Sequence, residues 1–142
     1  MLDDRQMLQY IYQNAEMGRD GISHVLPFVK DAKLAQALTE QQEEYRASCS
    51  EAERLLHDKG EEAGGSGLMA KVMTRVSSDV QALSDPSPSH IAEMMIQGNT
   101  MGVTKMVRHL HDFKPADQRV QSLAKRQLET AQDNIEQMKT FL

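Results

Sequence analysis

The sequence predicts an all-α fold, a four-helix bundle with one additional short helix, in a single domain over residues 1–142. Apolar residues recur every three to four positions along most of the chain, which places them on one face of each helix. Aromatic residues make up only 4% of the chain, whereas β-sandwiches and barrels need many aromatic and β-branched residues. Glycines and prolines cluster between the apolar repeats. They divide the chain into helices at about 3–30, 31–59, 68–83, 88–111 and 115–141, with a flexible linker over 60–67.

The first predicted helix has a clear start and a weak end. Asp3 is a favourable N-cap, and Gln6 three residues later completes a capping box. Near the other end, Asp20 and Gly21 followed by Pro27 predict a kink or a short break.

The next two long helices also carry boundary signals. Asp31 is a favourable N-cap for the second helix, and Lys59 followed by Gly60 forms a cationic last turn with a glycine stop. Ser87 as N-cap and Pro88 at the first helical position mark the start of the third long helix.

The connections predict how the helices are arranged. Short connections join the first and second long helices, and the third and fourth, so each pair is expected to form an antiparallel hairpin. The linker over 60–67 and the short helix over 68–83 are long enough to traverse the bundle. This gives an up-down-down-up order, in which the second and third long helices are parallel. The competing topology is a simple up-down bundle with the short helix as an end cap.

The third long helix carries more apolar surface than one interface needs. Its apolar residues include Met94, Met95, Ile96, Met101, Val103, Met106, Val107 and Leu110. Either the short helix covers the second face, or this face is a homodimer seam. A methionine-lined groove that receives an amphipathic helix or an apolar ligand is a further alternative. Gly98 and Gly102 are expected opposite Ala131 and Gln127.

Two segments, Tyr10–Gly18 (YIYQNAEMG) and Ser87–Gly98 (SPSHIAEMMIQG), are similar to segments of a small bacterial family with no assigned activity. The predicted helix order makes the chain resemble the ferritin-like superfamily over nearly its whole length. Ferritin-like oxidases and storage proteins hold a di-iron or di-manganese centre. An inward Glu on each of two helices and Glu-x-x-His on each of the other two bind it. The resemblance therefore implies metal chemistry only if these ligands are present.

The ligands of that pattern do not map well onto this chain. None of the four long helices contains Glu-x-x-His, and Glu129 with Gln132 is the nearest form. Of the alternative metal candidates, Glu16, Glu93 and Glu129 are expected to point away from the apolar faces, and Glu44 lacks a paired His. We therefore expect no cofactor and keep iron or manganese only as an alternative.

Amide side chains occupy the inward positions instead. These residues are Asn14, Gln41, Gln127 and Asn134. A buried amide must find hydrogen-bond partners or cost about 1–3 kcal/mol. We expect a buried polar layer that fixes the helix register, with binding of a small polar ligand as the alternative.

Composition and charge limit the partners. The net charge is −5 and the pI is about 5.5, and basic residues are dispersed among acidic ones, so nucleic acid is not an expected partner. No stretch approaches the ~20 apolar residues of a membrane span, so no membrane insertion is expected. The single Cys49 and the lack of a secretory signal indicate the cytoplasm.

These observations favour a non-enzymatic helical bundle that acts through protein–protein contact or as a homo-oligomer. The reasons are the missing inward carboxylates and imidazoles and the surplus of apolar surface. One alternative is a metal-binding ferritin-like oxidoreductase or storage protein with a degenerate di-iron or di-manganese site. The other is a carrier of a small apolar ligand in the methionine-lined groove.

Overall fold

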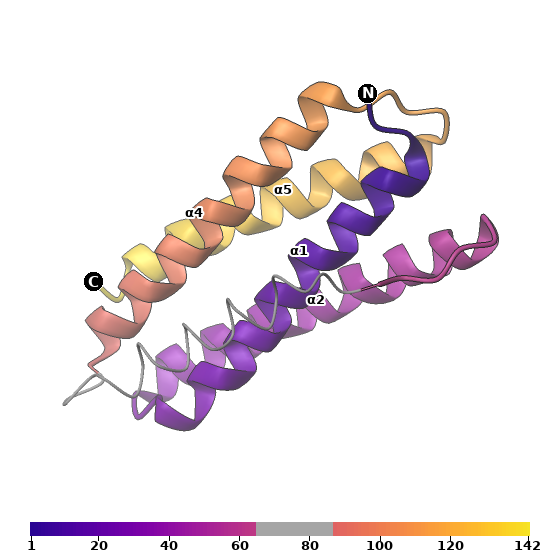
Figure 1. Cartoon of the computed structure of the whole chain (residues 1–142). Helices are drawn as coiled ribbons and strands as arrows, with labels where there is room; N and C mark the ends of the chain where they lie inside the picture. Colours follow the sequence, from indigo (N-terminus) through magenta and orange to yellow (C-terminus); the bar gives the residue numbers. More distant parts are fainter. Residues whose placement is uncertain (65–86) are drawn as a thin grey trace.

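The computed structural model describes residues 1–64 and 87–142 and has four α-helices in these ranges. They are α1 (Asp4–Val25), α2 (Ala32–Asp58), α4 (Pro88–Asp112) and α5 (Gln118–Lys139), and a short 3₁₀ helix, η1 (Leu26–Phe28), follows α1 (Figure 1). Within these ranges the only β contact is an isolated bridge between Leu2 and Phe113. The all-α prediction is confirmed for the described residues. The helix expected over 68–83 and the second part of the linker, 65–67, lie outside them.

The predicted helix starts are confirmed at three caps. The Asp3 carboxylate accepts a hydrogen bond from the Gln6 backbone N–H at 2.8 Å, and the Gln6 side chain accepts one from the Asp3 N–H at 3.0 Å. Asp31 and Ser87 cap α2 and α4 by accepting the N–H three residues further on. Pro88 occupies the first turn of α4. Backbone N–H groups of the first turn have no acceptor within the helix, so the lack of an N–H in proline costs no hydrogen bond there.

Two predicted helix boundaries are wrong. The first helix was expected to reach about residue 30, but α1 ends at Val25. The kink or break predicted from Asp20, Gly21 and Pro27 is absent at Gly21 and present at Pro27, which lies in η1. The last helix was expected from residue 115, but it starts at Gln118, because the Asp117 side chain accepts the Arg119 N–H and so acts as the N-cap.

The end of α2 is a complete glycine stop. Gly60 has a φ of 77°, in the left-handed region where a side chain is strained. Its N–H donates to the carbonyl of His57 at 2.9 Å, and the Glu61 N–H donates to that of Leu56 at 2.9 Å. These two bonds form a Schellman motif, which turns the chain sharply away from the helix axis.

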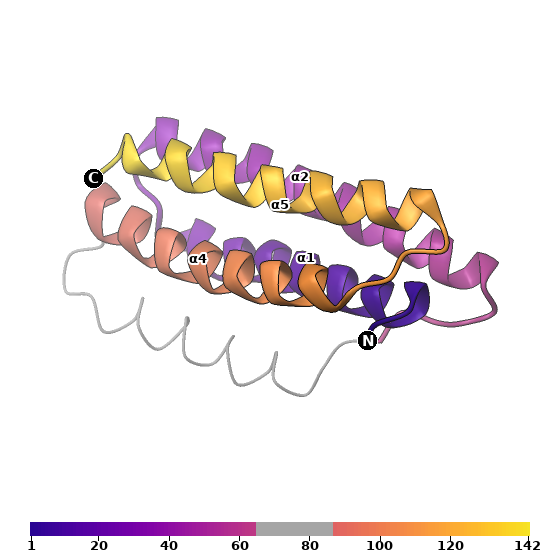
Figure 2. The same cartoon turned by 90° about the horizontal axis from the view of Figure 1, so that it is seen from above.

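The helix directions follow from contacts at one end of the bundle. The chain before α1 meets the end of α4, where the Leu2 N–H donates to the Asp112 carbonyl at 2.7 Å. The end of α2 meets the start of α5, where Lys59 lies 2.9 Å from Asp117. Therefore α1 is antiparallel to α2 and α4, and α5 is antiparallel to α4 and α2. The pairs α1–α5 and α2–α4 each run in the same direction (Figures 1 and 2).

The core consists of two apolar clusters toward opposite ends of the bundle. Cluster A contains Ala15, Ile22, Val25, Leu34, Ala37, Leu38, Tyr45, Cys49, Ile91, Ala92 and Met138. Cluster B contains Met7, Leu8, Ile11, Ala52, Leu55, Leu56, Met106, Val120, Leu123 and Ala124. Full burial of each large aliphatic side chain contributes about 1.5–3 kcal/mol. Buried polar side chains accompany these clusters, and we call them the polar layer.

Candidate functional site

The polar layer contains more amides than the sequence predicted. Gln41 is fully buried, Gln127 is 2% exposed and Asn134 is 3% exposed, while Asn14 is half-buried. Two further amides, Gln42 and Asn99, are also buried. Gln42 follows Leu38 by four residues, and that spacing is the signal that could have found it. Asn99 precedes Met106 by seven residues, but α4 has apolar residues on two adjacent sides.

One part of the layer joins α5, α1 and α4. The Gln127 Nε2 donates to the Ile11 carbonyl and to Asn14 Oδ1, both at 3.1 Å. Asn14 Nδ2 in turn donates to the Gly102 carbonyl at 3.2 Å. A Cβ added at Gly102 would lie 3.0 Å from that Nδ2, so the glycine leaves room for the amide.

The expected pairing of the two α4 glycines is wrong. Gly102 lies against Asn14 of α1 and not against Gln127, and Gly98 is exposed, with no atom of the described residues within 4 Å of an added Cβ. The rotation of α4 explains the difference, because Asn99 and Met106 define its core side. Gly102 then lies toward α1, and Gly98 turns outward.

A second part of the layer is centred on Tyr45 of α2. The Tyr45 hydroxyl donates to Asn99 Oδ1 of α4 at 2.9 Å and accepts from Asn134 Nδ2 of α5 at 3.4 Å. Burial raises the pKa of Tyr45, so its hydroxyl stays protonated and available as a donor. The ring packs against Gly18 of α1, where an added Cβ would be 2.8 Å from ring carbons. All four helices therefore meet at this side chain.

Two glutamines of α2 form further hydrogen bonds of the polar layer. Gln41 Nε2 donates to Gln137 Oε1 of α5 at 2.8 Å. Gln42 Nε2 donates to the Arg19 carbonyl at 2.9 Å and to Ser23 Oγ. Because these partners lie on α5 and α1, α2 is held by hydrogen bonds on both of its flanks.

Some buried amide atoms have no protein hydrogen-bond partner. They include Nδ2 of Asn99 and Oε1 of Gln41 and Gln127. Leaving a buried polar atom unpaired costs about 1–3 kcal/mol. Nδ2 of Asn99 is a hydrogen-bond donor, the two Oε1 atoms are acceptors, and all three belong to neutral amides. Their chemistry fits a small neutral polar molecule such as water, and it does not supply the negative charge that a pair of iron ions requires.

The four candidate glutamates do not form a ligand cluster. Glu44, Glu93 and Glu129 are exposed, and Glu16 is half-buried with its Oε2 buried and unpaired. Within residues 1–64 and 87–142, no group of three or more His, Cys, Asp or Glu side chains is placed to hold a metal ion. Partial burial raises the pKa of Glu44, and repulsion from Asp133 adds to this.

The apolar residues of α4 divide between the core and the surface. Met106 is 2% exposed and belongs to cluster B, so its assignment to a groove or interface is wrong. Met94, Met95 and Ile96 are half-buried against cluster A, and Leu110 is half-buried against cluster B. Val103 and Val107 are half-buried. Met101 is 53% exposed.

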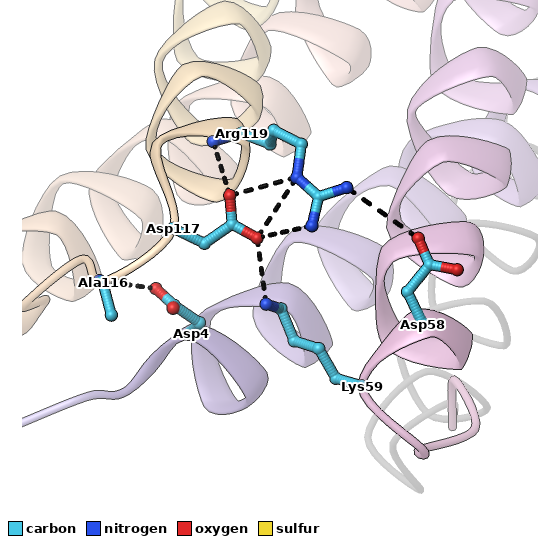
Figure 3. Close-up of polar contacts among 6 residues, drawn as sticks. All are labelled: Asp4, Asp58, Lys59, Ala116, Asp117 and Arg119. Atoms are coloured by element: carbon cyan, nitrogen blue, oxygen red, sulfur yellow. Dashed lines mark hydrogen bonds and ion pairs between the residues drawn. The ribbon is translucent and has the colours of Figure 1, made fainter.

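The end of the bundle where α2 stops and α5 begins carries an ion-pair cluster (Figure 3). Asp117 accepts from Lys59 Nζ at 2.9 Å and from the Arg119 guanidinium at 2.8 Å. The same guanidinium lies 3.9 Å from Asp58. Beside it, Asp4 of α1 accepts from the Ala116 N–H at 3.1 Å. The cluster therefore ties the ends of three helices together.

Two other reactive side chains have packing roles. Burial raises the pKa of the Cys49 thiol to about 11, so it is protonated at neutral pH and is a poor nucleophile. His109 of α4 stacks on Tyr10 of α1, with ring centroids 3.7 Å apart. Burial, with the nearby Lys105, lowers the pKa of His109, so the stacked imidazole is neutral at neutral pH.

Within the described ranges, no helix has an apolar stretch long enough to cross a membrane. The chain matches no protein-family model, no curated protein and no solved structure.

Proposed function

We propose that the chain is a non-catalytic helical bundle that acts by self-association, and that the outer face of α4 is the contact surface. The observation that carries the proposal is Met101, a large apolar side chain in the middle of α4 that is 53% exposed. Met94 is seven residues away, so it lies on the same side of the helix. The exposed Gly98 lies between them and lacks side-chain bulk.

This outer face suits a second copy of the same helix. Two α4 helices related by a two-fold axis would place Met94 and Met101 of each copy against the other. Gly98 would let the two backbones approach closely, as small residues do at helix crossings. A stable dimer buries about 800 Å² per partner, so further residues along α4 and its neighbours would have to take part.

The polar layer supports a structural role for the interior. Its side chains are amides and a tyrosine that bond mainly to one another and to backbone carbonyls. The thiol of Cys49 is protonated, Glu44, Glu93 and Glu129 are exposed, and Glu16 is half-buried. The buried amides, tyrosine and thiol of the described residues are all neutral, which supports a structural role, and metal binding is the weaker alternative.

The proposal includes the finer fold. The parallel course of α2 and α4 supports a ferritin-like arrangement with one long crossover. A short crossover helix over 68–83 belongs to the same hypothesis and falls on residues outside the described ranges. A cytoplasmic location in a bacterium, with a protein partner other than a second copy as the alternative, also remains part of the hypothesis.

Sedimentation velocity over a wide concentration range tests self-association. We expect a reversible dimer for the wild-type chain. Met101→Glu puts a charge at the centre of the contact and should weaken dimerisation at least tenfold, which corresponds to about 1.4 kcal/mol. Gln132→Glu, on the exposed side of α5, introduces the same charge and should leave dimerisation unchanged. A compact wild-type monomer at every concentration would contradict the proposal, as would equal effects of the two substitutions.

A further inference from the structure

The chain that leaves α2 turns back along α1 instead of running into solvent (Figure 1). We call residues 61–64 the strap. Its first residue, Glu61, pairs with Arg5 of α1 at 3.5 Å. Ala63 packs against cluster B. The strap is therefore held by an ion pair at one position and by apolar contact two residues later.

The strongest contacts to the strap come from one glutamine of α1. Gln9 Nε2 donates to the Glu62 carbonyl at 2.8 Å, and Gln9 Oε1 accepts from the Gly64 N–H at 3.1 Å. One side-chain amide thus bonds to the carbonyl and the N–H on either side of Ala63. A residue of a neighbouring parallel strand pairs with an extended chain in the same way. Gln9 therefore recognises the backbone of the strap and not its side chains.

The contacts also give the strap a direction. Arg5, Gln9 and Gln13 are spaced four residues apart, so they form a row along one side of α1. Glu61 lies at the first of them, and Gly64 reaches the last, where its carbonyl accepts from Gln13 Nε2 at 3.3 Å. The strap thus runs from the start of α1 toward its end.

The start of α4 lies at that far end of α1. Ile91 and Ala92, in the first turns of α4, belong to cluster A together with Ile22 and Val25 from the last turns of α1. A chain that follows the row of α1 is therefore heading to where α4 must begin. In a simple up-down bundle the next helix would instead begin beside the end of α2.

We propose that Gln9 is a backbone clamp that commits the chain leaving α2 to a path along α1, toward the start of α4. Gly60 reverses the direction of the chain at the end of α2. Gln9 then binds the backbone of Glu62 and Gly64. The direction in which residues 61–64 run is the one that a parallel course of α2 and α4 requires. The clamp acts within one copy of the chain and does not depend on self-association.

Amide hydrogen exchange followed by NMR tests the clamp on the full chain. Gln9→Leu removes both bonds at once, and we expect the Gly64 amide to exchange at least tenfold faster. The amides of Gly60 and Glu61 should keep their rates, because their acceptors lie in α2. Cleavage by a glutamate-specific protease after Glu62 should accelerate in parallel.

Two further variants keep the test decisive. Gln36→Leu, on the exposed side of α2, removes only a contact to Glu40 and should change none of these rates. Gln9→Asn has the same amide on a shorter arm, so it should lose Gly64 protection even if Gln9→Leu fails to fold. Unchanged exchange at Gly64 in a folded Gln9 variant would overturn the clamp. Equal acceleration at Gly60 and Glu61 would also overturn it, because it would show fraying of α2.

Discussion

Tyr45 is constrained on two sides at once. Its hydroxyl is bonded to Asn99 and Asn134, so the side chain cannot swing away without breaking those bonds. Its ring lies against Gly18 of α1, where an added Cβ would be 2.8 Å from ring carbons. In a close-packed interior such a contact has little room to relax.

This geometry predicts the effect of a single methyl group. Gly18→Ala would gain up to about 1 kcal/mol of helix propensity, but its Cβ would lie 2.8 Å from the Tyr45 ring. Overpacking of this kind costs about 1–3 kcal/mol, so we expect a net loss of stability in denaturant unfolding. Gly98→Ala provides the matched control, because the described residues leave its Cβ position open. Measured at low concentration, where the chain is monomeric, it should not destabilise the fold. Stabilisation by Gly18→Ala would contradict this account.

The sequence predicted some of the buried amides of the polar layer but not all of them. Gln41, Gln127 and Asn134 could be placed inside because each falls within the apolar stripe of its helix. Asn99 could not be recognised as readily, because α4 has apolar residues on two adjacent sides and periodicity alone does not choose between them. The choice comes from the hydroxyl of Tyr45, a contact 54 residues away in the chain.

Helix ends were predictable where a side chain caps them locally. Asp3, Asp31 and Ser87 each satisfy N–H groups within three residues, so their effect is visible in the sequence. The start of α5 was placed at residue 115, whereas the structure uses Asp117 as the N-cap. Pro115 suits a first helical position, but Asp117 also receives Lys59 from the end of α2, and that distant partner cannot be read from local sequence.

The Asp117 cluster predicts an acid-sensitive contact between these helix ends. Hydrogen bonds from Arg119 and then from Lys59 hold the pKa of Asp117 well below its usual range. The ionised carboxylate therefore favours the folded state. Its contribution is complete above the unfolded-state pKa of about 4 and is lost as the pH falls through the lower folded-state value.

Asp117→Asn tests this pH dependence. At neutral pH we expect the variant to unfold at a lower temperature than the wild type, because Lys59 and Arg119 lose their charged partner. The difference should shrink as the pH is lowered below about 4, because the Asp117 carboxylate of the unfolded chain then takes up a proton while the folded carboxylate is still ionised. Glu129→Gln, at an exposed position of α5, removes the same charge and should not reproduce this pattern. A difference that stays constant with pH would show that the charge of Asp117 does not contribute to stability.

At the scale of the whole molecule, the described residues form two helix hairpins joined along an interface that is both apolar and polar. The α1–α2 and α4–α5 hairpins follow from the short connections in the sequence, and the structure has both (Figure 2). Their relative placement is not encoded in any single periodic pattern. It follows from contacts such as Asn14 with Gln127 and Gly102, which join one hairpin to the other. Apolar clusters A and B alone would tolerate a shift between hairpins, since hydrophobic contact is not directional.

A double-mutant cycle tests whether the polar layer fixes that placement. Gln127→Leu strands Asn14 Oδ1, and Asn14→Leu strands one donor site of Gln127, so each should cost about 1–3 kcal/mol. The double variant leaves neither amide unpaired, and we expect its loss to fall short of the sum by about 0.5–3 kcal/mol. Asn14→Leu with Gln132→Leu, at an exposed position of α5, should be additive.

The same double variant separates stability from uniqueness. Polar core residues can fix the register of helical assemblies. If the bonds of Asn14 and Gln127 do so here, replacing both residues by leucine should allow neighbouring registers. Doubled amide resonances in α4 and α5, with the helix content retained, are the expected result. A single set of sharp resonances would instead show that side-chain packing in clusters A and B already specifies the register. In that case the polar layer would be free to serve another purpose, such as binding a small neutral molecule through Asn99 and Gln127.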